Sequence, residues 1–256
     1  MTGLRVALLH GLAGSTALWQ RWCAQPPDRV EPLPVDIDWP VDGSAHPGAP
    51  GDPAELVARA VRTTGAEVVV AHSFAANALL EYLVRERDSG LRGAVLVSPF
   101  YRPRQQDFDW AAISHYFNRF HLILEEGLRV SSGDRLPPVT RESMALRVRE
   151  RIGPYGWMDF FGAYLRTPGL AVHRVRIPVL TVAGEDDFAA RPADAAALDR
   201  ALPDGRLEIL PSCGHFPMAE QPTRFGELLT EFLGSLTAAP HRPGGPPPAI
   251  TPLEMT

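Results

Sequence analysis

The sequence contains no lysine, and all 25 basic residues of the 256-residue chain are arginines. Chemistry that needs a lysine amine is therefore excluded, including Schiff-base formation, pyridoxal phosphate anchoring and phosphate binding by a P-loop lysine. Only two cysteines are present, Cys23 and Cys213, which cannot build a disulfide framework, and no paired Cys/His spacing suggests zinc. We therefore expect no metal, no cofactor and a reduced, cytoplasmic location.

Long apolar runs and clusters of basic charge are also missing. No stretch of 18 or more apolar residues exists, so no transmembrane helix is expected. The N-terminal run MTGLRVALLHG has no small-residue cleavage site after it, so it is predicted to form a strand rather than a secretory signal. The formal net charge is −5 and the basic residues are dispersed, which argues against nucleic-acid binding. A small molecule is the expected partner, and the oligomeric state stays open.

Apolar runs rich in Val, Leu and Ile alternate with helical patterns, which is typical of a parallel β-sheet with helical crossovers. Strands are predicted at 5–10, 31–37, 67–72, 92–98, 178–183 and 206–210. Helices are predicted at 15–25, 53–65, 74–88, 192–202 and 220–236. Because continuous apolar strands are typical of sheets covered on both faces, the predicted fold is α/β, with a mostly parallel sheet of about six strands between helical layers.

The stretch from 100 to 173 departs from this pattern, because it lacks strand-like runs and is dense in aromatic residues. Helical spacing at 108–126, 140–152 and 155–166 predicts a helical cap inserted into an α/β core that comprises 1–99 and 174–236. The final stretch, 237–256, contains six prolines and is predicted to be an extended or disordered tail.

One serine stands at the sharpest point of a predicted strand-to-helix turn. In EVVVAHSFAAN, residues 67–77, Ser73 follows a β-branched run, and a helix-forming segment begins at once. An ordinary strand–helix connection that happens to contain serine is the plain alternative. A catalytic serine would also need a histidine to remove its proton, an acid to orient that histidine, and backbone donors for an oxyanion.

Candidates for the base and the acid also follow predicted strands. His215, in PSCGHFPMAEQP, comes after the last strand, and VAGEDDF places Glu185, Asp186 and Asp187 after the fifth. A turn histidine and a solvated acidic cluster are the alternatives. Because active sites of open α/β sheets lie at the carboxyl ends of strands, these residues can share one edge of the sheet with Ser73. The chain order Ser, Asp, His is one of the known orders of a catalytic triad.

A glycine-containing turn follows the first predicted strand. In LLHGLAGS, residues 8–15, Gly11 and Gly14 permit a tight turn whose backbone N–H groups can face a substrate oxygen. The spacing is not GxGxxG, so dinucleotide binding is not supported. Four such features after four predicted strands favour one catalytic centre at this edge.

Together, HGLAGS, AHSFA, AGEDDF and SCGHFPMAEQP resemble the α/β-hydrolase superfamily, over nearly the whole chain except the tail and, loosely, the cap. The resemblance implies that Ser73 is the nucleophile, His215 the general base and then acid, and Asp187 the residue that orients His215. Asp187 is preferred to Asp186 because the family usually places its acid three residues after the glycine that ends the strand, here Gly184.

By the same resemblance, the backbone N–H groups of Leu12 and Phe74 would bind the oxyanion. Two features depart from the family pattern. Ala71 and Ala75 stand where glycines usually flank the nucleophile, and alanine is still small enough for the strand and helix to pack closely. The given sequence begins at the HG-bearing strand, so we expect it to lack the one or two strands that commonly precede that strand, which leaves the subfamily open.

A serine nucleophile disfavours the family branches that use aspartate, the epoxide hydrolases and haloalkane dehalogenases. The prediction that remains is acyl transfer through an acyl-serine intermediate, with an ester, a thioester or a lactone as substrate. The same fold and triad could instead serve C–C bond hydrolysis or lyase, cyclase or epimerase chemistry. A non-catalytic binding protein is the third alternative.

The aromatic cap predicts an apolar substrate, because ligand pockets are mostly apolar with a few placed polar groups. Packing of the cap on the sheet is the alternative role for the same aromatics. Polar contacts to the substrate are the alternative for His115, Arg119 and His121, which are predicted to lie at the surface. The residues expected to contact the substrate are His10, Gly11, Phe100, Trp110, Phe117, Trp157 and Phe161.

Overall fold

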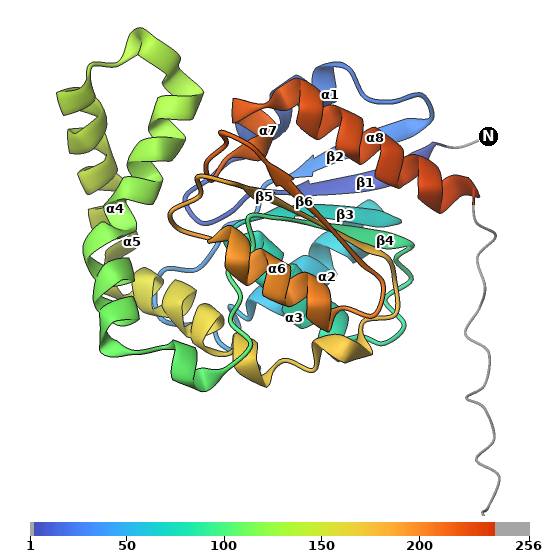
Figure 1. Cartoon of the computed structure of the whole chain (residues 1–256), viewed down its shortest axis with the longest axis horizontal. Coiled ribbons are helices and arrows are strands. Elements are labelled where there is room, and N and C mark those ends of the chain that lie inside the picture. The colour runs from blue at the N-terminus through green and yellow to red at the C-terminus, as the bar shows by residue number, and fades with distance from the viewer. Residues whose placement is uncertain (1–2, 239–256) are drawn as a thin grey trace, which may run out of the picture.

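A parallel β-sheet forms the centre of the protein (Figure 1). The computed structural model describes residues 3–238, so the predicted tail lies outside the described residues except for 237 and 238, which end the last helix. Within the described part, the strand order is β2-β1-β3-β4-β5-β6, and every pairing is parallel. The strands are β1 Leu4–Leu9, β2 Val30–Val35, β3 Val68–His72, β4 Gly93–Val97, β5 Val179–Gly184 and β6 Gly205–Leu210.

The six predicted strands are confirmed, each within two residues of its predicted bounds. In β3, β4 and β5 every residue is buried, since helices cover both faces of the sheet there. The edge strands β2 and β6 carry more exposed positions. The continuous apolar runs in the sequence thus mark the central strands of a sheet with two covered faces.

Two helical layers cover the sheet. One apolar cluster joins α2, α3 and α6 to one face, and a second joins α1 and α8 to the other (Figure 1). The predicted helix at 15–25 is a 3-10 turn, Thr16–Trp19, followed by α1, and the predicted helix at 220–236 is divided at Gln221. The helices are α1 Gln20–Ala24, α2 Pro53–Thr64, α3 Phe74–Arg85, α6 Pro192–Ala201, α7 Pro217–Glu220 and α8 Pro222–Ala238.

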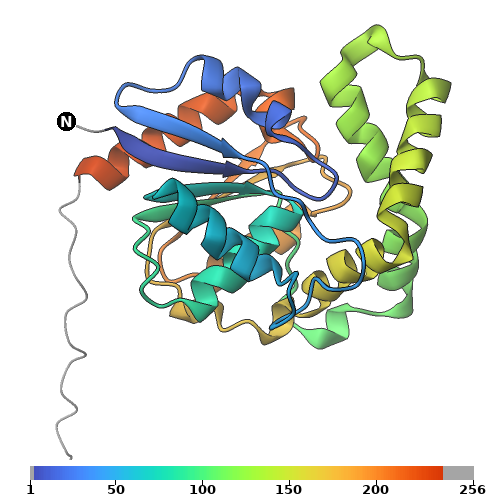
Figure 2. The ribbon, with the colours of Figure 1, turned by 180° about the vertical axis from the view of Figure 1, so that it is seen from behind.

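Two long helices form a layer beside the edge of the sheet where the strand arrows end (Figures 1 and 2). These are α4, Trp110–Ser132, and α5, Pro138–Leu165. The α5 helix is broken at Gly153, which has φ 66° and precedes Pro154, so the prediction of separate helices at 140–152 and 155–166 is confirmed. The division of the chain into core and cap at 99 and 174 stays a prediction. Short 3-10 turns complete the chain at Gln105–Asp107, Gly133–Arg135, Thr167–Gly169 and Val172–Arg174.

Buried aromatic rings and an ion pair attach α5 to the core. Phe100 follows β4, and the centroid of its ring lies 4.9 Å from that of Phe160 and 5.4 Å from that of Tyr164, with both pairs edge-to-face. Such pairs add about 0.5–1.5 kcal/mol each beyond the burial of their surface. Arg166, just after α5, forms an ion pair of 2.9 Å with the buried Glu81 of α3. These contacts hold the end of α5 against the core, and α4 packs against α5.

Candidate active site

Ser73 stands at a sharp turn between β3 and α3. Its backbone angles are φ 57° and ψ −122°, a conformation that non-glycine residues rarely adopt and that often marks a functional site. The Ser73 N–H donates to the carbonyl of Val97 at 2.8 Å, so pairing with β4 continues up to the turn. The flanking Ala71 and Ala75 are fully buried, which fits the requirement for small residues where strand and helix meet.

The structure brings Ser73, His215 and Asp187 together from the turns after β3, β6 and β5. Ser73 Oγ lies 3.0 Å from His215 Nε2, and His215 Nδ1 lies 2.8 Å from Asp187 Oδ2. The other carboxylate oxygen, Oδ1, accepts the N–H groups of Ala189 and Ala190, both at 2.9 Å. Because Asp187 is acceptor-only, it holds the proton on Nδ1 and leaves Nε2 free to accept the serine proton.

The other two acids of the GEDDF turn face away from His215. Asp186 and Glu185 are exposed, and Glu185 accepts the N–H of Ser212 at 3.2 Å. Asp187 is buried beside His215. The geometry therefore selects Asp187 as the partner of the histidine.

Electrostatics around His215 favour its charged form. Burial alone disfavours the imidazolium, but the carboxylate of Asp187, assisted by those of Glu126 and Glu220, raises the pKa of His215. The neighbouring His72 differs, because burial and the proximity of His215 hold its pKa well below the ordinary range. Neutral His72 can donate from Nε2 to the backbone carbonyl of His215 at 2.8 Å.

The loop after β1 lies directly against the serine. A Cβ atom added to Gly11 would stand 3.0 Å from Ser73 Cβ and 3.1 Å from the carbonyl oxygen of His72, so a side chain there would have to push the loop and the serine turn apart by a few tenths of an ångström. Within the described residues, no backbone hydrogen bond outside the helices and strands uses the N–H of Leu12. Phe74 begins α3, so its N–H has no intrahelical partner. Both predicted oxyanion donors are therefore available beside Ser73.

His10, which precedes Gly11, is bonded to the segment that follows β2. Its Nε2 lies 3.0 Å from Asp36 Oδ1 and 3.2 Å from the N–H of Ile37, and its carbonyl accepts Trp39 Nε1–H at 3.0 Å. The ring is buried. His10 was predicted to contact the substrate, but these contacts place it in the framework that holds Gly11.

A cavity of about 370 Å³ opens at Ser73 and His215, between the β1 loop, α1, α4, α5 and the His215 turn. Apolar side chains contribute much of the wall, and among the described residues that line it Arg21 is the one arginine and no aspartate or glutamate is present. The apolar wall consists of Leu12, Leu18, Ile123, Leu124, Leu128, Val130, Val148 and Phe216. Such a wall suits an apolar group bound next to the serine.

Of the seven residues predicted to contact the substrate, only Gly11 lines this cavity. Phe100 is buried, and the centroid of its ring lies 5.7 Å from that of the His215 ring. Trp157 stacks on Phe161 with the ring centroids 4.9 Å apart. Trp110 and Phe117 are 82% and 64% exposed. The aromatics predicted to contact the substrate thus pack against other rings or face solvent, while aliphatic residues of α4 and α5 form part of the wall. The sequence does not show which face of α4 docks toward the serine.

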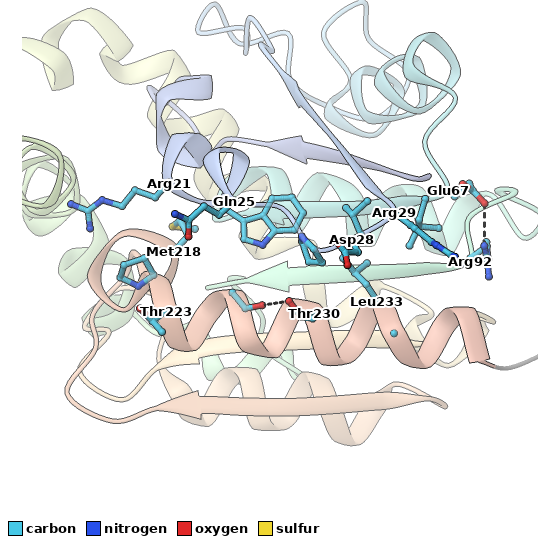
Figure 3. Close-up of a pocket in the computed structure, with 17 residues that line it drawn as sticks. Arg21, Gln25, Asp28, Arg29, Glu67, Arg92, Met218, Thr223, Thr230 and Leu233 are labelled. Atoms are coloured by element: carbon cyan, nitrogen blue, oxygen red, sulfur yellow. Dashed lines mark hydrogen bonds and ion pairs between the residues drawn. The ribbon is translucent and has the colours of Figure 1, made fainter. Parts of the chain in front are cut away.

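A larger cavity, about 980 Å³, lies away from Ser73, between α8 and the β2 side of the sheet (Figure 3). Its lining includes Trp22, Leu233 and the ion pair of Arg92 with Glu67, at 3.2 Å. Among the described residues that line it there is no serine, cysteine or histidine, so a triad like that of Ser73 is not found there.

Residues 3–238 lack two further features. They hold no group of three or more His, Cys, Asp or Glu side chains arranged to bind a metal ion. No helix in the same range is both long and apolar enough to cross a membrane.

The family model of the alpha/beta hydrolase family matches residues 6–228, and the chain therefore belongs to this family. The esterase from Thermogutta terrifontis shares the fold, with a TM-score of 0.63 and 20% sequence identity over 92% of this chain and 91% of that one. At this identity the likeness concerns the fold.

Two curated relatives match over shorter stretches. A proposed carbamate hydrolase, RutD, of Cronobacter turicensis is 39% identical over 69 residues, which is 27% of this chain and 26% of the relative. A proposed 2-succinyl-6-hydroxy-2,4-cyclohexadiene-1-carboxylate synthase of Bacillus subtilis is 39% identical over 67 residues, 25% of this chain and 23% of the relative. The chain thus matches about a quarter of the length of each.

Proposed function

We propose that this protein is a serine hydrolase that cleaves an ester or thioester bond of a small, largely apolar substrate through an acyl-serine intermediate. The observation that carries the proposal is the hydrogen-bond chain from Ser73 to His215 and Asp187, at 3.0 and 2.8 Å, at the end of an apolar cavity. Membership of the alpha/beta hydrolase family supports it.

In the proposed reaction, Ser73 Oγ attacks the substrate carbonyl while His215 Nε2 takes the serine proton. The N–H groups of Leu12 and Phe74 bind the oxyanion, and one such donor contributes roughly 3–4 kcal/mol to the transition state. His215 then gives its proton to the leaving group. A water molecule, activated by His215, hydrolyses the acyl-enzyme and releases the acid.

The cavity wall indicates the substrate class. Aliphatic side chains from the β1 loop, α4 and α5 line the space next to Ser73, and no carboxylate of the described residues lines it. An uncharged acyl group of moderate size fits this wall, because a buried cation or anion would lack a partner along most of it. A lactone with an apolar chain belongs to the same class.

A second candidate function keeps the triad but not the acyl-enzyme. The relative from Bacillus subtilis is named as a synthase, and this chain shares 39% identity with a quarter of it.

The relative from Cronobacter turicensis is named for carbamate hydrolysis, which would use the same acyl-serine route on a different bond. Substrate tests must therefore include more than esters.

The proposal is tested by labelling with a fluorophosphonate, which reacts with activated serines. We expect labelling of the wild-type protein and of Ser131→Ala, and none of Ser73→Ala. Ser131 lines the same cavity, but its hydroxyl donates to the Leu128 carbonyl at 3.1 Å and not to a histidine, so it is a matched control. Turnover is then measured with p-nitrophenyl esters of graded chain length, acyl thioesters and carbamates.

Two results would contradict the proposal. Absence of labelling in the folded wild-type protein would exclude an activated Ser73. Full turnover of any substrate by Ser73→Ala would show that no acyl-serine is needed and would favour the second candidate.

A further inference from the structure

Carboxylates from two helices surround the turn that carries His215. Glu220 of α7 accepts the N–H of Gly214 at 3.2 Å and that of Phe216 at 3.0 Å. The N–H between them, that of His215 itself, stabilises the charged form of Glu126, which comes from α4. The N–H groups on either side of the histidine thus bond Glu220, and the N–H of His215 itself acts on the charge of Glu126.

Glu126 is seated tightly against this turn. A Cβ atom on Gly214 would overlap Glu126 Oε1, so the carboxylate rests on the glycine. The side chain is only 14% exposed, and its Oε2 is buried without a close hydrogen-bond donor among the described residues. Burial raises the pKa of Glu126, and the proximity of His215 partly opposes this rise. A buried carboxylate with so few donors costs stability, which calls for a functional reason.

The charge of Glu126 is only partly compensated. Arg129 lies 3.8 Å from Glu126 and 3.5 Å from Glu220, but its side chain is half exposed and screened by solvent. The groups that face His215 are therefore Asp187 from the turn after β5, Glu126 from α4, Glu220 from α7 and neutral His72 from β3. Negative charge dominates this environment.

We propose that Glu126 is a positioning residue for His215: its carboxylate holds the backbone of the histidine turn and stabilises the imidazolium that forms while Ser73 is acylated. The proposal rests on the proposed function of Ser73. Since α4 also lines the cavity through Ile123, Leu124 and Leu128, docking of this helix links substrate binding to the electrostatics of the histidine.

The test compares Glu126→Gln with Glu125→Gln. Glu125 is the next acid on the same helix, and its side chain points roughly 100° away around the helix axis. The rate of phosphonylation of Ser73 by a fluorophosphonate is measured from pH 5 to pH 9, together with thermal unfolding of each variant. Glu126→Asp, which keeps the charge, serves as the conservative variant.

For Glu126→Gln we expect the plateau rate to fall about three- to tenfold and the acid limb to move to lower pH by roughly half a unit, because loss of a nearby negative charge lowers the pKa of His215. The deficit therefore shrinks as the pH falls. Glu126→Asp should retain an acid limb near that of the wild type, and Glu125→Gln should match the wild type throughout.

Three outcomes separate the possibilities. No phosphonylation of the wild type would contradict the proposed function of Ser73. Wild-type labelling together with an unchanged rate and limb in Glu126→Gln would overturn the role of Glu126. An equal loss at every pH, with a lower unfolding temperature and no shift of the limb, would assign Glu126 a purely structural role and also overturn it.

Discussion

Replacing Asp187 by Asn tests the proposed triad most directly. The Oδ1 atom of Asp187 accepts the N–H groups of Ala189 and Ala190, and Asn can keep both bonds with its carbonyl oxygen. The amide nitrogen must then take the place of Oδ2, which lies 2.8 Å from His215 Nδ1. An NH₂ group facing Nδ1 requires an acceptor there, so the histidine proton moves to Nε2 and points at Ser73 Oγ.

A histidine held in this tautomer cannot accept the serine proton. We expect kcat/KM to fall by roughly 10³- to 10⁴-fold, or about 4–5.5 kcal/mol in the activation free energy. Since the two buried backbone donors stay satisfied, the loss of folding stability stays within about 1–3 kcal/mol. Asp187→Ala would leave both donors without a partner, which makes Asn the cleaner substitution.

The assay is hydrolysis of a p-nitrophenyl ester at pH 8, with thermal unfolding to confirm that the variant is folded. Asp186→Asn is the matched control: this neighbouring acid is exposed, so its effect should stay within about twofold. A larger loss from Asp186→Asn than from Asp187→Asn would refute the assignment of the acid.

Two further predictions concern pH and chain length. His215 must be neutral to act as the base, and the surrounding carboxylates raise its pKa. We therefore expect kcat/KM to decline as the pH falls, with a midpoint above the ordinary histidine pKa of about 6.5. A midpoint at or below that value would contradict the electrostatic account. Leu128→Phe should narrow the cavity and lower kcat/KM for long-chain relative to short-chain esters by about tenfold or more, whereas Phe117→Leu, on the exposed side of α4, should leave this ratio unchanged. A changed ratio in Phe117→Leu together with an unchanged ratio in Leu128→Phe would instead support the aromatic substrate site expected from the sequence.

The strands could be predicted because burial on both faces of a sheet requires a continuous run of apolar residues, which is visible in the local sequence. Val68–His72 and Gly93–Val97 are fully buried, so each reads as an unbroken apolar run. Helix ends were predicted less accurately where contacts with distant parts of the chain decide them. The α4 helix continues to Ser132, six residues past its predicted end, because its far half packs over the cavity and the His215 turn.

The residues of the candidate triad could be found because each lies in a short turn at the end of a strand, where local sequence decides the geometry. Asp187 could be separated from Asp186 only by the family pattern, and the structure adds the reason: two backbone donors turn Asp187 inward. The cavity wall could not be predicted. The same helix α4 offers Phe117 and Leu128, and only its docking decides which of them faces the serine.

The helices over the sheet edge contact two of the three turns that carry the candidate triad. Tyr116 of α4 donates to the carbonyl of Ala189 at 2.8 Å, and the N–H of Ala189 is one of the two donors that orient Asp187. Farther along the same helix, Glu126 rests against the turn of His215. A displacement of α4 would therefore disturb the acid and the base together with the cavity wall. Substitutions that weaken its docking should lower kcat as well as raise KM, whereas changes confined to the cavity wall should act mainly on substrate preference.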